Sequence, residues 1–74
     1  MSEEIKLTEN EKAVLRNLPG YMEEIANKVG LSTVAVRRIL NDLVGRVLIY
    51  QKDDDFEHDF HYRITEYGKK ALNQ

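Results

Sequence analysis

The sequence contains no cysteine among its 74 residues. Without thiols the chain forms no disulfide, no thiolate metal site and no cysteine nucleophile. It also has no apolar run near the roughly 20 residues needed to cross a bilayer. The acidic start, Met1–Glu4, lacks the basic and apolar regions of a signal peptide. These absences predict a soluble, cytoplasmic protein with no membrane segment.

Proline and glycine are also sparse, with one Pro and four Gly distributed between patterned segments instead of gathered in a linker. A chain of this length has room for one domain, which buries only about 60% of the surface of its unfolded chain. We therefore expect residues 1–74 to form a single domain, too small for a deep catalytic cavity. The sequence shows no Ser/His/Asp spacing, phosphate-binding glycine loop or convincing metal cluster. It predicts no enzyme, no cofactor and no metal site.

The formal net charge of −2 by itself argues against a nucleic-acid partner. The charges are unevenly distributed, however. Residues 1–11 hold four Glu and one Lys, and residues 53–59 hold five acidic residues without any Lys or Arg. These two pieces carry −3 and −5, so residues 12–52 and 60–74 together carry +6. The middle of the chain is therefore basic, although the net charge of the whole chain is negative.

Capping residues and apolar periodicity predict three helices. Thr8-Glu9-Asn10-Glu11 has the pattern of a capping box and begins a helix that extends to about Leu18. A second helix is predicted over about 21–28, ended by Gly30, which adopts positive φ without strain. Ser32 is a suitable N-cap for a third helix over about 33–44.

The apolar period then changes to the alternation of strands. Residues 47–52 and 60–65 are predicted to be antiparallel strands joined by the acidic tip 53–59, and Thr65 can cap a last helix over about 66–72. The expected fold class is α+β, with a three-helix core, a two-stranded antiparallel hairpin and a short C-terminal helix.

A group of residues in the middle of the chain has the pattern of a helix-turn-helix. A helix-turn-helix needs a small residue where its helices cross, and Ala26 provides it. It needs a residue tolerant of positive φ at the turn four positions later, where Gly30 stands, and apolar residues inside the second helix, here Val36 and Ile39. The short turn sets the two helices at a wide angle and exposes one face of the second.

This pattern resembles the winged helix-turn-helix DNA-binding transcriptional regulators of bacteria and archaea, over about residues 7–73. The resemblance also rests on Leu48-Ile49 and on Tyr62–Leu72, which is similar to the family's Tyr-x-Leu-Thr-x-x-Gly ending. It implies a helix-turn-helix over about 21–44 and a wing over about 47–65.

The resemblance further implies that the third helix lies in the major groove of DNA. The family's exposed positions are occupied here by Ser32, Thr33, Val34, Arg37, Arg38 and Asn41. Arginine suits guanine O6 and N7 or a phosphate, asparagine suits adenine, and hydroxyls at a helix N-terminus can donate to a phosphate. Taken alone, paired arginines on a helix also fit a merely solvated face.

Three features depart from the family pattern. The family often has glycine where Val47 stands, whereas here the glycine is Gly45. The family often has a short strand between the first two helices, where residues 19–21 leave room for little more than a bridge. Family wings usually carry Arg or Lys, but residues 53–59 of this wing are acidic. In addition, Gly68 is expected to weaken the last helix.

The acidic tip has three interpretations. It can be a solvated loop whose charges discourage edge-to-edge pairing, or a contact for a basic protein partner with Phe56 as an apolar anchor. A divalent ion could also bind the alternating carboxylates, although the spacing and glycine of an EF-hand are absent. These alternating carboxylates are Asp53, Asp55, Glu57 and Asp59. His58 and His61 are interpreted as surface residues.

The sequence therefore predicts sequence-specific binding of double-stranded DNA by a transcriptional regulator. The alternative is a winged-helix protein-interaction module that uses the acidic wing. A homodimer is expected on DNA, with the contact made by Leu7 and the first helix or by the last helix around Leu72.

Overall fold

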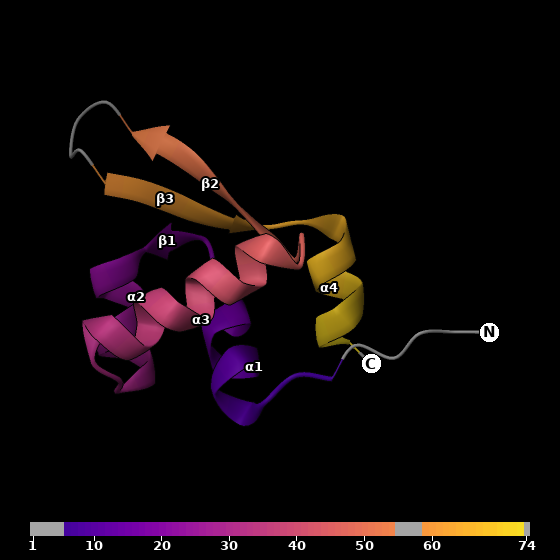
Figure 1. The fold of residues 1–74 in the computed structure, drawn as a ribbon, viewed down its shortest axis with the longest axis horizontal. Helices are drawn as coiled ribbons and strands as arrows, with labels where there is room; N and C mark the ends of the chain where they lie inside the picture. The colour runs from indigo at the N-terminus through magenta and orange to yellow at the C-terminus, as the bar shows by residue number, and fades with distance from the viewer. Residues whose placement is uncertain (1–5, 55–58, 74) are drawn as a thin grey trace.

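The computed structural model describes residues 6–54 and 59–73, and its elements follow the predicted order. The helices are α1 (Glu9–Arg16), α2 (Met22–Val29), α3 (Thr33–Gly45) and α4 (Glu66–Leu72), and the strands are β1 (Gly20–Tyr21), β2 (Ile49–Asp54) and β3 (Asp59–Ile64). Figure 1 shows α1, α2 and α3 gathered on one side of the sheet, with the β2–β3 hairpin extending beyond them. This confirms the α+β winged-helix architecture. Within the described ranges, no helix is long and apolar enough to cross a membrane.

The predicted capping box begins α1. The hydroxyl of Thr8 accepts from the Glu11 amide at 3.1 Å, and the Glu11 carboxylate accepts from the Thr8 amide at 2.8 Å. The helix ends at Arg16, two residues before the predicted end. The Asn17 side chain there donates to the Ala13 carbonyl at 2.7 Å, and the residue preceding a proline is sterically disfavoured in helical conformation.

The sheet has three strands, one more than predicted. All pairings are antiparallel and the order is β1–β3–β2, so β3 is central. The short strand β1 places Gly20 opposite Tyr62 and Tyr21 opposite His61. The predicted bridge at residues 19–21 is therefore a real two-residue strand, and α2 begins at Met22 because Tyr21 belongs to that strand.

The hairpin is longer than predicted at its tip. Backbone pairing runs from Ile49 opposite Ile64 to Asp54 opposite Asp59, so part of the acidic stretch expected in the loop lies in the strands. The interpretations that depend on residues 55–58, including Phe56 as an anchor, lie outside the described residues.

The core forms where the helices meet the sheet. Its fully buried side chains come from α1, α2, α3 and the start of the hairpin, and Tyr62 and Ala71 extend it to β3 and α4. Burying a side chain of this size contributes about 1.5–3 kcal/mol, so these positions dominate the stability of a small domain. The largest fully buried residues are Val14, Leu15, Ile25, Val36, Leu40, Leu43, Leu48 and Ile49.

The junction between α3 and β2 has an unusual backbone conformation at Val47. This residue has a φ of 63°, a left-handed conformation that β-branched residues rarely adopt. The Leu48 amide donates to the Leu43 carbonyl and the Val47 amide to the Val44 carbonyl, both at 3.0 Å. These paired bonds close the end of α3 around a left-handed residue, and β2 begins at Ile49 instead of 47. Valine thus takes a conformation that glycine, without a Cβ atom, adopts at no steric cost.

Gly68 has a packing role that was not predicted from the sequence. The bounds predicted for α4 are confirmed, but a Cβ atom at Gly68 would lie 2.0 Å from the Leu48 carbonyl oxygen. The Thr65 hydroxyl accepts from the Gly68 amide at 2.9 Å and donates to the Val47 carbonyl at 2.8 Å. Glycine therefore permits a close approach between α4 and the α3–β2 junction, which offsets its low helix propensity.

We expect Val47→Gly to stabilise the protein by up to about 1 kcal/mol. The substitution relieves a left-handed conformation that costs a residue with a Cβ atom about 1–2 kcal/mol. The greater freedom of glycine in the unfolded chain offsets part of this gain. Urea unfolding followed by circular dichroism measures the difference. Val34→Gly is the matched control, because Val34 is similarly exposed (60% against 64%) but lies in a helix, where glycine should destabilise by roughly 0.5 kcal/mol. Loss of stability in both variants would contradict the assignment of strain to Val47.

Candidate nucleic-acid interface

The turn between α2 and α3 has the geometry that the sequence predicted. Gly30 caps α2 with a φ of 74°, and its amide donates to the Ala26 carbonyl at 2.9 Å. The Leu31 amide donates to the same carbonyl at 3.2 Å. Ala26 is buried in the core, at 3% exposure, so a larger side chain at this position would have to displace its neighbours. This tight turn sets the direction in which α3 leaves α2.

Helix α3 begins at the predicted N-cap. The Ser32 hydroxyl accepts from the Ala35 amide at 3.1 Å, which leaves its own proton free to donate outward. Val36, Leu40 and Leu43 are fully buried, and Ile39 packs against the same core. Because these residues recur at helical spacing, they hold one side of α3 inside the protein and turn the other side to solvent.

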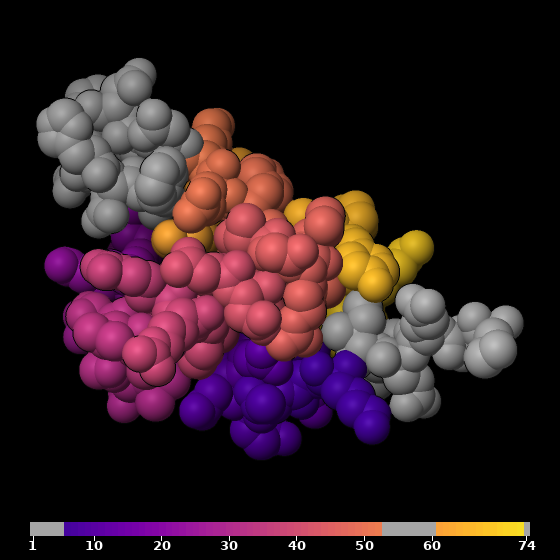
Figure 2. All heavy atoms as spheres, in the orientation of Figure 1, coloured from indigo at the N-terminus to yellow at the C-terminus, as the bar shows by residue number. Residues whose placement is uncertain are grey.

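All six predicted site residues lie on the solvent side of α3 or at its N-cap. Each of them is exposed: Ser32, Thr33, Val34, Arg37, Arg38 and Asn41. Figure 2 shows α3 running across the front of the molecule. The solvent side of the helix and its N-cap therefore present hydroxyl, apolar, guanidinium and amide groups.

Arg37 and Arg38 are available for an external partner. Where the structure describes side chains, residues 6–52 and 61–73, no ion pair or side-chain hydrogen bond involves either guanidinium. Both guanidinium groups are exposed to solvent, so an external partner can reach them. The arrangement is suited to a polyanion, because guanidinium groups bind phosphates and guanine edges through paired hydrogen bonds.

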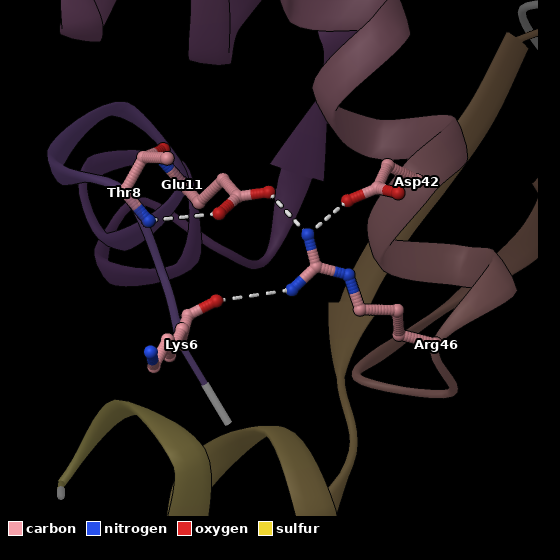
Figure 3. Close-up of polar contacts among 5 residues, drawn as sticks. All are labelled: Lys6, Thr8, Glu11, Asp42 and Arg46. Atoms are coloured by element: carbon pink, nitrogen blue, oxygen red, sulfur yellow. Dashed lines mark hydrogen bonds and ion pairs between the residues drawn. The ribbon is translucent and has the colours of Figure 1, made fainter. Parts of the chain in front are cut away.

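Arg46, directly after α3, is engaged inside the protein instead. Its guanidinium donates to Glu11 at 2.7 Å, to Asp42, and to the Lys6 backbone carbonyl at 3.3 Å (Figure 3). The Glu11 side chain is only 9% exposed, so the pair joins the start of α1 to the end of α3 in a partly buried setting. The hydrogen bond with Asp42 is the main cause that raises the pKa of Arg46; partial burial opposes it, and the charges of Glu11 and Asp42 add to it. Arg46 is therefore a positioning residue for α3.

This role of Arg46 was not predicted from the sequence. The spacing of Asp42 and Arg46, four positions apart on a helix, was a visible signal for a local ion pair. The contact with Glu11 crosses from α3 to α1 and has no local signature. Glu11 thus serves twice, because one carboxylate oxygen caps α1 while the other binds Arg46.

Comparisons with known proteins identify the fold. No protein-family model and no curated protein sequence matches the chain. Solved structures do match. The MepR–DNA complex from S. aureus has a TM-score of 0.83 and 20% identity, covering 90% of this chain and 60% of that one. PcaV from Streptomyces coelicolor, in complex with its natural ligand, has a TM-score of 0.84 and 22% identity, with coverage of 97% and 53%. BpsR from Bordetella bronchiseptica has a TM-score of 0.81 and 18% identity, with coverage of 92% and 55%.

The chain therefore has the winged helix-turn-helix fold of bacterial transcription regulators, including a structure described as a MarR-family regulator. The sequence identity to these three structures is 18–22%, so the comparison establishes a shared fold. The chain spans 53–60% of the length of these three proteins. MepR, whose structure in complex with DNA is among the three, and PcaV are named as transcription regulators. The DNA binding of BpsR is described as regulated by 6-hydroxynicotinic acid.

We expect Arg46→Met to destabilise the protein by about 1–2 kcal/mol. The change keeps the apolar stem but removes the guanidinium and leaves the buried Glu11 carboxylate without its partner. The expected loss of stability lies at the lower end of the range for hydrogen bonds to charged groups, because solvent screens Arg46, whose side chain is about a third exposed. Lys12→Met removes a longer pair, at 3.8 Å, with a Glu9 side chain that is 88% exposed. It is the control and should change stability by less than about 0.5 kcal/mol. Equal effects of the two variants in thermal unfolding would refute the positioning role.

Proposed function

We propose that this chain binds double-stranded DNA sequence-specifically as part of a transcriptional regulator, with α3 in the major groove. The observation that carries the proposal is the pair of exposed arginines on α3, which have no ion-pair partner among the described side chains and lie beside Asn41, opposite the buried stripe. The N-cap hydroxyls of Ser32 and Thr33 are placed to donate to a flanking phosphate. The similarity in fold to the MepR–DNA complex supports the same use of the domain.

The distribution of charge is compatible with this proposal despite the net charge of −2. DNA meets a local surface, and electrostatic attraction between exposed charges extends only about one Debye length, roughly 10 Å at 0.1 M salt. Arg37 and Arg38 carry two positive charges on α3, while Glu11 and Asp42 are occupied by Arg46. No described contact favours the alternative of a protein-interaction module that uses the acidic wing, and none of the three similar structures is described as such a module.

We expect Arg37→Ala with Arg38→Ala to leave the fold intact and to weaken binding to a selected duplex by about 1–3 kcal/mol for each base-reading contact. Fluorescence anisotropy at several salt concentrations measures the affinity and its salt slope. The slope should fall by about one unit for each phosphate that the variant no longer neutralises. Arg16→Ala with Lys70→Ala is the charge-matched control, because both residues are exposed and lie in α1 and α4.

A third variant separates base reading from charge. Arg37→Lys with Arg38→Lys keeps both positive charges but loses the paired hydrogen bonds of guanidinium, so non-specific binding should persist while sequence preference is lost. Native circular dichroism with unchanged affinity in the double alanine variant would refute the assignment of α3. A wild-type protein that shows no duplex binding even at low salt would refute DNA binding altogether.

We also expect two copies of the chain to bind one duplex. A single module of this size contacts few base pairs, whereas a two-fold pair spans two half-sites about one helical turn apart. The two predicted contact regions adjoin, because α1 contacts α4 (Figure 1). Leu7, which precedes α1, and Leu72, the last residue of α4, are both partly buried against the core. Sedimentation of the saturated complex should give two chains per duplex, and selected sites should be palindromic. One chain per duplex on an asymmetric site would contradict a dimer.

A further inference from the structure

Val34 is an apolar residue in an exposed place on α3. It lies in the first turn of the helix and is 60% exposed. The other exposed large hydrophobic side chains in the described part of the chain are Val47 (64%), Tyr67 (49%) and Tyr50 (45%), all outside α3. A β-branched residue at an exposed helical position is less favourable than alanine by roughly half a kcal/mol. The fold therefore gives no reason for valine at this position.

The position of Val34 relative to the polar residues of α3 suggests what it contacts. Arg37 and Arg38 are three and four residues later, so they are its neighbours on the helix surface. Asn41 follows at seven residues, about 20° away around the axis and about 10 Å along it. Val34 thus shares one face with the side chains that can hydrogen-bond to bases, at the end nearest the N-cap.

In the major groove of DNA, one kind of base carries an apolar group on its exposed edge. Guanine, adenine and cytosine present hydrogen-bond donors and acceptors there, and thymine adds its C5-methyl group. The valine side chain forms no hydrogen bond and gains nothing from a phosphate. Its favourable partner in the groove is therefore a thymine methyl, which it can remove from water together with its own methyl groups.

We propose that Val34 is a specificity-determining residue that contacts the C5-methyl group of a thymine. The inference rests on the proposed function and adds to it the identity of one base. Val34 and Arg38 are about 6 Å apart along the helix, and base pairs are stacked about 3.4 Å apart. The thymine is therefore expected within about two base pairs of the base read by the arginines.

Replacing thymine with uracil tests the proposal, because uracil lacks only the C5-methyl group and keeps the hydrogen-bonding edge. The full chain is first used to select binding sites from a random duplex library. Each thymine of the selected site is then replaced in turn by uracil, and duplex affinity is measured for the wild type. One position in each half-site should lose about three- to fivefold in affinity, the value expected for one buried methyl group.

Three variants assign that effect to a side chain. Val34→Ala should bind the thymine duplex more weakly and lose its sensitivity to uracil at that one position, while other positions are unaffected. Val34→Thr keeps one γ-methyl group and should retain part of the sensitivity. Val47→Ala, which shortens an equally exposed valine away from α3, should behave as the wild type.

The possible outcomes are distinct. A selected site without any uracil-sensitive thymine, or a sensitivity that persists in Val34→Ala, overturns the thymine contact but leaves DNA binding by α3 in place. The absence of any duplex binding overturns both. Because Val34 is exposed and alanine is the better helix former, Val34→Ala should fold normally, and circular dichroism checks this directly.

Discussion

The function proposed for this chain depends first on the burial of one stripe of α3. Val36, Leu40 and Leu43 are fully buried against α1, α2 and the start of the hairpin. Their transfer from water contributes several kcal/mol in total at about 1.5–3 kcal/mol each. No rotation of the helix can keep these side chains buried and also turn Arg37 or Arg38 inward. The hydrophobic core therefore selects the face of α3 that meets solvent, and with it the residues available to a partner.

The two ends of α3 are held by different means. At its start, the left-handed Gly30 and the small Ala26 allow a tight turn, and Ser32 caps the helix. At its end, the chain passes through the left-handed Val47 and is bound to α4 through Thr65. The close backbone approach that Gly68 permits keeps α4 against this junction. The conformation of Val47 and the contacts of α4 with the α3–β2 junction therefore set the direction in which the hairpin leaves α3.

The arginines of this chain show why a total charge is a poor guide to function. Arg46 is bound to Glu11 and Asp42 within the protein, whereas Arg37 and Arg38 have no described carboxylate partner. The same residue type thus stabilises the fold in one place and remains available for binding in another. Arg37 and Arg38, without a described ion-pair partner, can attract a polyanion at short range, and the acidic residues elsewhere in the chain do not remove that local attraction.

The sequence by itself determined the features that depend on neighbours three or four residues apart. The capping box at Thr8, the turn at Gly30, the cap at Ser32 and the bounds of α4 are local, so spacing alone predicts them. The exposed face of α3 follows in the same way, because its apolar period defines its opposite side.

Only the tertiary structure decided the remaining features, since each depends on residues far apart in the chain. The pairing of Gly20 with Tyr62 and the approach of Gly68 to Leu48 are of this kind, as is the ion pair between Arg46 and Glu11. The left-handed conformation of Val47 is another, because valine has no intrinsic preference for it and the packing on both sides must impose it. A local pattern cannot encode such contacts, because they form only after distant segments have been brought together by the burial of a common core.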